Sequence, residues 1–301
     1  MKIAVEGLGK MGTQIVKRLV DNGHSVIAVV RREASAQEAR AIGATAVLTK
    51  QDAVAEFGNE HIKVWLMIPA GAVDAEIDNW LEVLPSGSLL IDGGNSDFRG
   101  TIKHSELAES KDVRFVDIGV SGGVMGQKNG FSMMAGGHEE SYNQIKPVLD
   151  ALSPPRGGHE FFGPAGSGHY VKMVHNAIEY GMMESLAEGY RVLKEGHYPN
   201  IDLAKAGSIW QRASVIESTL SNLAFEVARE DTNLSDIEGV VAESGEARWT
   251  LEIAKEKGID MPAIESAFDV RLRSQKGEVN YATKMLAALR NKFGGHSLSG
   301  K

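Results

Sequence analysis

The chain has 301 residues, of which 43% are hydrophobic and 24% are charged, and it contains no cysteine. This length and composition are typical of a globular protein with two domains, and the lack of cysteine excludes disulfide bonds, thiolate metal sites and a cysteine nucleophile. The net charge of -8, without a basic run, argues against a nucleic-acid partner, and no apolar run is as long as a membrane span. We therefore expect a cytoplasmic protein.

A glycine-rich turn follows the first predicted strand. Residues 2–6 form a short apolar run, and residues 13–22 have the spacing of an amphipathic helix. Between them, the pattern G-x-G-x-x-G lets the backbone turn tightly and approach a pyrophosphate at the positive end of the helix. We expect a dinucleotide site at Gly7, Leu8, Gly9, Lys10, Met11 and Gly12, the alternative being a turn that binds no ligand.

The second predicted strand, residues 24–30, ends in Val30-Arg31-Arg32. NAD-binding sites carry an Asp or Glu there to hold the ribose hydroxyls, whereas arginine suits the 2′-phosphate of NADP. Arg31 and Arg32 therefore favour NADP as the cofactor. Glu33 follows at once and keeps NAD as a weaker alternative, and a solvated loop is the other explanation of the two arginines.

Strands and helices continue to alternate, which predicts a parallel, doubly wound sheet. The next strands are expected near 46 and at 62–68, 88–91 and 114–118, with helices at 34–42, from 51, at 73–83 and at 103–110. Ligands of such sheets bind beyond the carboxyl ends of the strands. We therefore expect Ile68, the last residue of the strand at 62–68, and Pro69 and Ala70, which follow it, to contact the cofactor.

Two later strands end in loops of small and polar residues, at 92–96 and 119–123. Both loops offer backbone N–H groups and a polar side chain, Asn95 in the first and Ser121 in the second. This composition suits close approach of an oxygen-rich ligand. Either loop is also explained as a tight turn.

A segment rich in proline and glycine, residues 154–168, follows a strand predicted at 131–135 and a helix predicted at 139–152. We place the domain boundary there, with domains at 1–165 and 166–301. The second domain is predicted to be all α, with helices at 166–194, 203–211, 214–229, 248–257, 261–274 and 281–292. The first of these would be about 45 Å long and forms the spine of the domain.

This long helix carries a polar stripe. Lys172, His175, Asn176 and Glu179 stand at i, i+3, i+4 and i+7, so they share one face of an otherwise apolar helix. The stripe predicts proton-handling chemistry. A solvated face with a Lys-to-Glu pair is the alternative.

Five motifs resemble those of the short-type decarboxylating 6-phosphogluconate dehydrogenases, within the β-hydroxyacid dehydrogenase group. They are the glycine-rich turn at 7–12 and the runs 91–96, 120–123, 172–180 and 290–296. The resemblance covers essentially the whole chain. It implies an N-terminal NADP-binding Rossmann-like domain and a helical domain for substrate binding and oligomerisation.

The resemblance implies oxidative decarboxylation of 6-phosphogluconate to ribulose 5-phosphate and carbon dioxide, with reduction of NADP and without a metal ion, in the pentose phosphate pathway. Lys172 is implied to be the general base and Glu179 the general acid, with Asn176 as a further catalytic residue. The alternatives are a β-hydroxyacid dehydrogenase that does not decarboxylate, and a catalytically idle NADP-binding protein with the same fold.

The resemblance also implies the ligand contacts. Asn95 is implied to contact both cofactor and substrate, and the carboxylate and hydroxyls of the substrate are implied to bind Asn95, Ser121, Gly122, Gly123, His175 and Asn176. Its phosphate is implied to bind Tyr180 and Arg271. Arg290 and His296 match a C-terminal pair that reaches the neighbouring subunit's substrate, which implies a homodimer or homotetramer.

The loop before Trp249-Thr250 departs from the family pattern. Larger members have a phosphate-binding Lys and Thr there, whereas residues 243–248 read Glu-Ser-Gly-Glu-Ala-Arg. Only Arg248 offers a substitute, so the departure puts phosphate binding by this loop in doubt. On composition alone, surface positions that pair with acidic residues are the better explanation of Arg271, Arg273 and Arg290.

Overall fold

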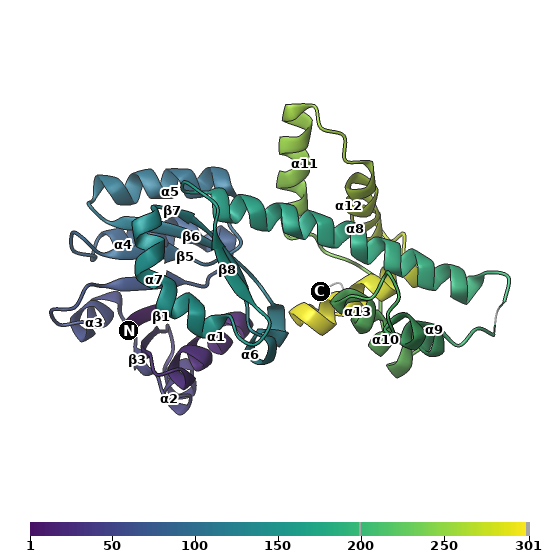
Figure 1. The fold of residues 1–301 in the computed structure, drawn as a ribbon, viewed down its shortest axis with the longest axis horizontal. Helices are drawn as coiled ribbons and strands as arrows, with labels where there is room; N and C mark the ends of the chain where they lie inside the picture. The colour runs from purple at the N-terminus through teal and green to yellow at the C-terminus, as the bar shows by residue number, and fades with distance from the viewer. Residues whose placement is uncertain (199, 299–301) are drawn as a thin grey trace. The chain divides into compact units, whose positions relative to one another are not determined.

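The computed structural model describes residues 1–198 and 200–298, which form two compact units, Met1–Met173 and Val174–Lys301 (Figure 1). The first unit contains the sheet, and the second is helical. Within the described ranges, no helix combines the length and the apolar character needed to cross a membrane.

The first unit is built on an eight-stranded sheet in the order β3-β2-β1-β4-β5-β6-β7-β8 (Figure 1). Its strands are β1 (Lys2–Glu6), β2 (Ser25–Val29), β3 (Thr45–Val47), β4 (Lys63–Leu66), β5 (Leu89–Asp92), β6 (Arg114–Ser121), β7 (Ser132–Gly137) and β8 (Gly158–Phe161). Successive residues of a strand face opposite sides, so Ile3 and Val5 lie in one hydrophobic core and Ala4 lies in the other. The sheet is therefore buried on both faces, as the sequence predicted.

The far edge of the sheet differs from the sequence prediction. Strands β1 to β6 pair in parallel, but β7 runs antiparallel to β6. The connection between β6 and β7 contains only η1 (Gly123–Met125) and α6 (Gly126–Asn129), which is too short for the crossover that a parallel pair needs. Strand β8 lies in the segment rich in proline and glycine, where no strand was predicted, and it pairs with β7 in parallel.

The helices of the first unit are α1 (Lys10–Asp21), α2 (Glu33–Ala41), α3 (Lys50–Glu56), α4 (Ala70–Leu81), α5 (Phe98–Ser110) and α7 (Glu139–Leu152). Several begin earlier than predicted because their caps lie earlier. Helix α5 starts at Phe98, since the Asp97 carboxylate accepts the backbone N–H of Arg99 at 2.9 Å. Helix α4 follows Pro69 directly, so Ala70 is helical and not part of a loop.

The second unit contains the larger part of α8 (Ser167–Glu195), followed by α9 (Leu203–Trp210), α10 (Thr219–Glu230), α11 (Glu246–Lys257), α12 (Pro262–Ser274) and α13 (Tyr281–Gly294). Helix α8 has 29 residues and is about 44 Å long. Helix α10 begins later than predicted because Ser218 caps it, accepting the backbone N–H of Ser221 at 3.1 Å. A capping box at Asn280 starts α13, which continues past Arg290.

Candidate active site

The glycine-rich turn has the geometry that a pyrophosphate needs. Gly7 has φ +98°, and a Cβ there would lie 2.3 Å from the Met67 carbonyl oxygen, while a Cβ on Gly12 would lie 1.9 Å from the Gly7 carbonyl oxygen. These two glycines close the turn tightly between β1 and α1. By contrast, a Cβ on Gly9 would meet nothing within 4 Å, and Gly9 caps α1 without a side-chain hydrogen bond. The start of α1 therefore has room for a dinucleotide beside its first N–H groups.

The end of β2 presents positive charge. Arg31 and Arg32 are exposed, and Arg31 lies within electrostatic range of Glu76. Glu33, the nearest acid along the chain, pairs with Arg40 at 2.6 Å. The carboxylate that would favour NAD is thus held by a partner on its own helix.

The loop after β5 is held by a buried aspartate. Asp92 is fully buried and accepts the backbone N–H of Gly94 at 3.0 Å and the hydroxyl of Ser96 at 2.8 Å. A Cβ on Gly93 would lie 2.0 Å from the indole nitrogen of Trp65. The buried Asp92 side chain therefore holds the turn in place, while Asn95 at the tip of the turn is exposed.

The second glycine loop is partly strand. The sequence predicted a loop from Gly119 onward, but β6 continues to Ser121, because Gly119, Val120 and Ser121 pair with β7. Gly122 and Gly123 then have φ +139° and +54°, which end the strand and begin η1. Ser121 is thus the last residue of β6, and the loop that follows it is shorter than predicted.

The first turns of α8 are locked onto the sheet. Buried Asp117 of β6 accepts the backbone N–H groups of Gly166 and His169, both at 2.8 Å. Lys172 is 5% exposed, and a Cβ on Gly119 would lie 2.2 Å from its Cβ. The absence of a side chain at Gly119 therefore sets the position of the Lys172 backbone within the first unit.

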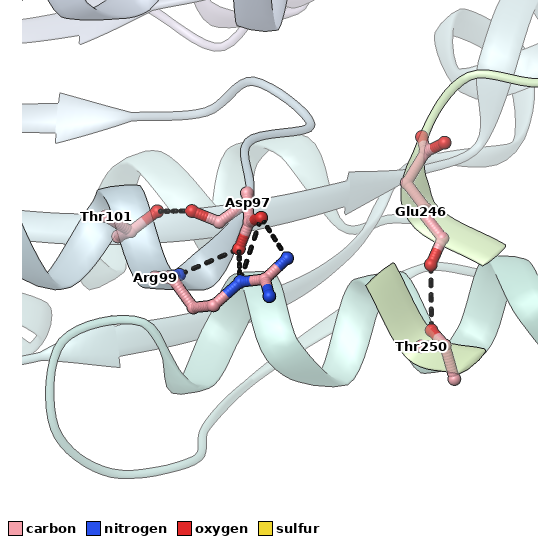
Figure 2. A network of polar contacts seen from close by, with 5 residues as sticks. All are labelled: Asp97, Arg99, Thr101, Glu246 and Thr250. Atoms are coloured by element: carbon pink, nitrogen blue, oxygen red, sulfur yellow. Dashed lines mark hydrogen bonds and ion pairs between the residues drawn. The ribbon is translucent and has the colours of Figure 1, made fainter. Parts of the chain in front are cut away.

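A polar network ties α5 to this part of α8. Figure 2 shows Asp97 accepting the backbone N–H and the guanidinium of Arg99, and the hydroxyl of Thr101 donating to the Asp97 carbonyl at 3.2 Å. Thr101 also bonds the His169 ring at 2.8 Å. This network supports the segment that carries Lys172.

Two polar residues of α8, His175 and Asn176, are hydrogen-bonded to each other in the second unit, and Glu179 lies close to them. The His175 Nδ1 atom lies 3.0 Å from the Asn176 Oδ1 atom and 4.0 Å from a Glu179 carboxylate oxygen. The Asn176 amide donates to Glu246 at 2.9 Å. The predicted polar stripe is therefore an organised cluster.

Tyr180 and Arg271 form a buried pair. The Arg271 guanidinium lies 3.2 Å from the centroid of the Tyr180 ring, and Arg271 is only 1% exposed. Burial lowers the pKa of Arg271 to about 10, with Arg290 adding to the fall, while Tyr180, Glu179 and Glu184 oppose it. The surface explanation of Arg271 is wrong, because this side chain is part of the core.

Arg290 shares the same electrostatic environment. It is 8% exposed, and burial lowers its pKa, although Tyr180, Glu246, Glu179 and Glu243 favour its charged form. The surface explanation is wrong here too, whereas Arg273 does match it: Arg273 is about half exposed and pairs with Asp269 at 2.9 Å. His296 is exposed, and its carbonyl accepts the Asn291 amide at 2.7 Å.

The loop before Trp249 contacts the Tyr180 hydroxyl. Ser244 donates its backbone N–H to the Tyr180 hydroxyl at 3.3 Å, and the two hydroxyl oxygens lie 3.5 Å apart. Arg248 forms an ion pair with Glu243, so the proposed substitute for the missing Lys already has a carboxylate partner. The loop contributes Ser244 and Glu246 to the cluster.

Glu184 is a buried carboxyl group that the sequence did not single out. It is 7% exposed, and its Oε2 atom has no hydrogen-bond partner within the described ranges. Burial raises its pKa to about 7, and the charge of Glu188 adds to this, while Arg271 and Arg273 oppose it. Glu184 thus holds a proton part of the time near neutral pH, within electrostatic range of Arg271 and Arg273.

We expect Glu184→Gln to stabilise the protein at pH 8 but not at pH 4.5. Since the folded pKa of about 7 exceeds the ordinary value of 4.5, stability falls as pH rises between these values. The neutral amide removes that loss, by about 1–2 kcal/mol once solvent screening is allowed for. Urea unfolding at the two pH values measures it, and an equal gain at both would contradict the assignment.

Sequence reasoning missed Glu246 and Glu184. Glu184 lies within two turns of the polar stripe on α8. The pattern of polar and apolar residues around it is that of any amphipathic helix, so it gave no special signal. Glu246 stands in the loop at 243–248 that departs from the family pattern, so the departure itself was the available signal. Its contact with Asn176 joins residues 70 positions apart and leaves no local pattern.

Comparison with known proteins matches nearly the whole chain to one family. The model of the NAD binding domain of 6-phosphogluconate dehydrogenase matches residues 2–160, and that of the 6-phosphogluconate dehydrogenase C-terminal domain matches residues 168–299. A decarboxylating, NAD(+)-dependent 6-phosphogluconate dehydrogenase of Haloferax volcanii is 36% identical, covering 100% of this chain and 99% of the relative.

Solved structures of two dehydrogenases have a fold similar to that of this chain. The 6-phosphogluconate dehydrogenase of Plasmodium falciparum, solved in apo form and with NADP+ and 6-phosphogluconate, has a TM-score of 0.77 and 28% identity, covering 96% of this chain and 70% of that chain. A 3-hydroxyisobutyrate dehydrogenase of Mycobacterium tuberculosis has a TM-score of 0.73 at 22% identity, covering 96% of this chain and 99% of that one. The second likeness concerns the fold alone.

Proposed function

Because the chain belongs to the 6-phosphogluconate dehydrogenase family, we propose that it converts 6-phosphogluconate to ribulose 5-phosphate and carbon dioxide with NADP, as a step of the pentose phosphate pathway. One observation carries the proposal. A single helix, α8, bears Lys172, the hydrogen-bonded pair of His175 and Asn176, and Glu179, whose carboxylate lies 4.0 Å from the His175 ring. That constellation suits a reaction with two separate proton transfers.

The cofactor binds the glycine-rich turn, and when bound it supplies the hydride acceptor. Its pyrophosphate lies at Gly7, Leu8, Gly9, Lys10, Met11 and Gly12. Arg31 and Arg32 would hold the 2′-phosphate. The segments that follow β4 and β5 would supply Ile68, Pro69 and Asn95, and the start of α4 would supply Ala70. Open space at Gly9 and the ion pair that holds Glu33 support this assignment.

Lys172 takes the proton from the 3-hydroxyl of the substrate as carbon 3 is oxidised. The 3-keto acid then loses carbon dioxide, and Lys172 returns a proton to the developing enolate oxygen. Glu179 protonates carbon 1 of the enediol, which gives ribulose 5-phosphate. The rigid attachment of α8 to β6 through Gly119 and Asp117 supports Lys172 as the base, because an acid–base catalyst must be held in place.

The remaining residues hold the substrate. Asn95, Ser121, Gly122, Gly123, His175 and Asn176 bind its carboxylate and hydroxyls. Tyr180, Arg271 and Arg290 bind its phosphate and replace the Lys and Thr that the loop at 243–248 lacks. The concentration of two buried arginines around Tyr180 supports an anion site in this part of the second unit.

A second copy of the chain completes the assembly as a homodimer or homotetramer. Helix α8 exposes large apolar side chains, Ile178 at 51%, Met182 at 44% and Val192 at 69%. Because Arg290 interacts with Tyr180 and Glu179 of its own chain, we assign it to its own site, and His296 to the neighbouring subunit's site. Light scattering tests the assembly.

The direct test is NADPH formation with 6-phosphogluconate, together with trapping of carbon dioxide. Equal amounts of NADPH and carbon dioxide are expected. NADPH without carbon dioxide would identify a non-decarboxylating β-hydroxyacid dehydrogenase, in which Glu179 has no role. Cofactor binding without any turnover would identify an idle NADP-binding protein.

We expect Arg31→Asp combined with Arg32→Asn to lower kcat/KM for NADP by about 10²-fold or more, with a far smaller change for NAD. Each charge-assisted contact to the 2′-phosphate contributes about 1.5–3 kcal/mol. The two specificity constants measure the effect. A wild-type enzyme that already prefers NAD, as the name of the Haloferax volcanii relative states for that enzyme, would refute the assignment.

A further inference from the structure

Glu246 occupies a defined place beside the proposed substrate residues. It is the first residue of α11, and only 2% of it is exposed. Gly245, the cap of α11, has φ +103°, and a Cβ there would lie 2.6 Å from the Trp249 ring. Figure 2 shows the Thr250 hydroxyl donating to the Glu246 carbonyl, at 2.8 Å. The backbone of Gly245 before Glu246 and the hydrogen bond from Thr250 after it therefore fix the position of Glu246.

From this geometry we infer that Glu246 is a positioning residue, which sets the orientation of the Asn176 amide and, through it, the tautomer of His175. The inference rests on the proposed function, in which Asn176 and His175 hold the substrate. In this role Glu246 needs no contact of its own with substrate or cofactor, because its carboxylate accepts from the Asn176 amide. It acts through the two bonds described next.

The direction of both hydrogen bonds follows from the chemistry of the carboxylate. An ionised carboxylate only accepts, so the Asn176 NH2 group must face Glu246, at 2.9 Å. The Asn176 Oδ1 atom then faces His175 Nδ1 at 3.0 Å, and a carbonyl oxygen also only accepts. His175 Nδ1 therefore carries the proton, with Glu179 Oε2 at 4.0 Å favouring the same state. In the neutral ring, Nε2 is left as an acceptor for a substrate hydroxyl.

Glu246 also stabilises positive charge in the cluster. Burial lowers the pKa of Arg290, and among the carboxylates that oppose this fall Glu246 acts most strongly, ahead of Glu179 and Glu243. One buried carboxylate thus orders a hydroxyl-binding pair on α8 and supports an arginine on α13. A neutral side chain at this position would not provide the second of these effects.

The test compares Glu246→Gln with Glu243→Gln in the full chain. Glutamine keeps the shape of Glu246 but both donates and accepts, so the Asn176 amide can flip and His175 can take either tautomer. Glu243→Gln removes a nearby carboxylate whose bonds go to Gly245 and Arg248, and it serves as the matched control. Long-range 1H–15N correlation spectra of the histidine rings at pH 8 report the tautomer, with the His175 signals assigned by their loss in His175→Gln.

We expect a single Nδ1–H tautomer in the wild type and in Glu243→Gln, and a mixture in Glu246→Gln. Adding Asn176→Asp to Glu246→Gln should restore the single tautomer, because the carboxylate introduced on α8 can only accept, both from the glutamine amide and from His175 Nδ1. An unchanged single tautomer in Glu246→Gln would overturn the inference.

Kinetics add an independent readout. Glu246→Gln is expected to raise KM for 6-phosphogluconate about tenfold, because one ordered hydrogen bond to the substrate is lost. The effect on kcat should be smaller, and Glu243→Gln should change KM less. If the wild type does not turn over 6-phosphogluconate at all, the proposed function fails. The tautomer measurement, made without substrate, still decides the role of Glu246.

Discussion

Lys172→Met is expected to lower kcat for 6-phosphogluconate by about 10³-fold or more, while the dissociation constants of substrate and NADPH change little. Methionine keeps the length of the side chain against β6 but cannot accept a proton, and general base catalysis typically contributes about 10²–10⁴-fold. Because Lys172 is 5% exposed and packs on Gly119, the substitution should not disturb the fold. Single-turnover kinetics and fluorescence titration measure the two quantities.

The matched control is Lys194→Met, at the other end of the same helix, where the Lys194 ammonium donates to Asn233 at 2.7 Å. It should leave kcat unchanged. Glu179→Gln should slow turnover less than Lys172→Met, because it affects only the later protonation of carbon. Near-normal turnover by Lys172→Met would refute Lys172 as the base.

Much of the first unit was predictable because its signals are local. The glycine-rich turn and the alternation of strand and helix predicted a doubly wound sheet, and residues 139–152 were predicted as a helix with the observed bounds. The strand at β7 was predicted, but its antiparallel direction was missed, since pairing direction depends on the length of a connection. Strand β8 was missed altogether, because it has only four residues and begins with a glycine.

The site was predictable only along α8. Helical spacing placed His175, Asn176 and Glu179 together, and the structure shows them in contact. The burial of Arg271 and Arg290 was not visible, because a charged residue in a helix has the same pattern whether it faces solvent or a buried tyrosine. Tertiary contacts decide this, and the chain gives no local sign of them.

Arg271→Met is expected to raise KM for 6-phosphogluconate by about 10²-fold, with little effect on kcat/KM for gluconate, which lacks the phosphate. Charge-assisted bonds to a phosphate contribute about 1.5–3 kcal/mol each, and a buried guanidinium is well placed to make two of them. Methionine fills the space against the Tyr180 ring and keeps an aromatic contact through its sulfur. Steady-state kinetics with both substrates measure the difference.

The comparison of substrates separates two roles for Arg271. Since Arg271 is only 1% exposed and lies 3.2 Å from the Tyr180 ring centroid, it has the contacts of a residue that supports Tyr180 as well as those of one that binds an anion. Loss of support would impair 6-phosphogluconate and gluconate alike, whereas loss of a phosphate contact impairs only the first. Arg273→Met, on the same helix but paired with Asp269 at the surface, should change neither, which excludes a general effect of removing positive charge from α12.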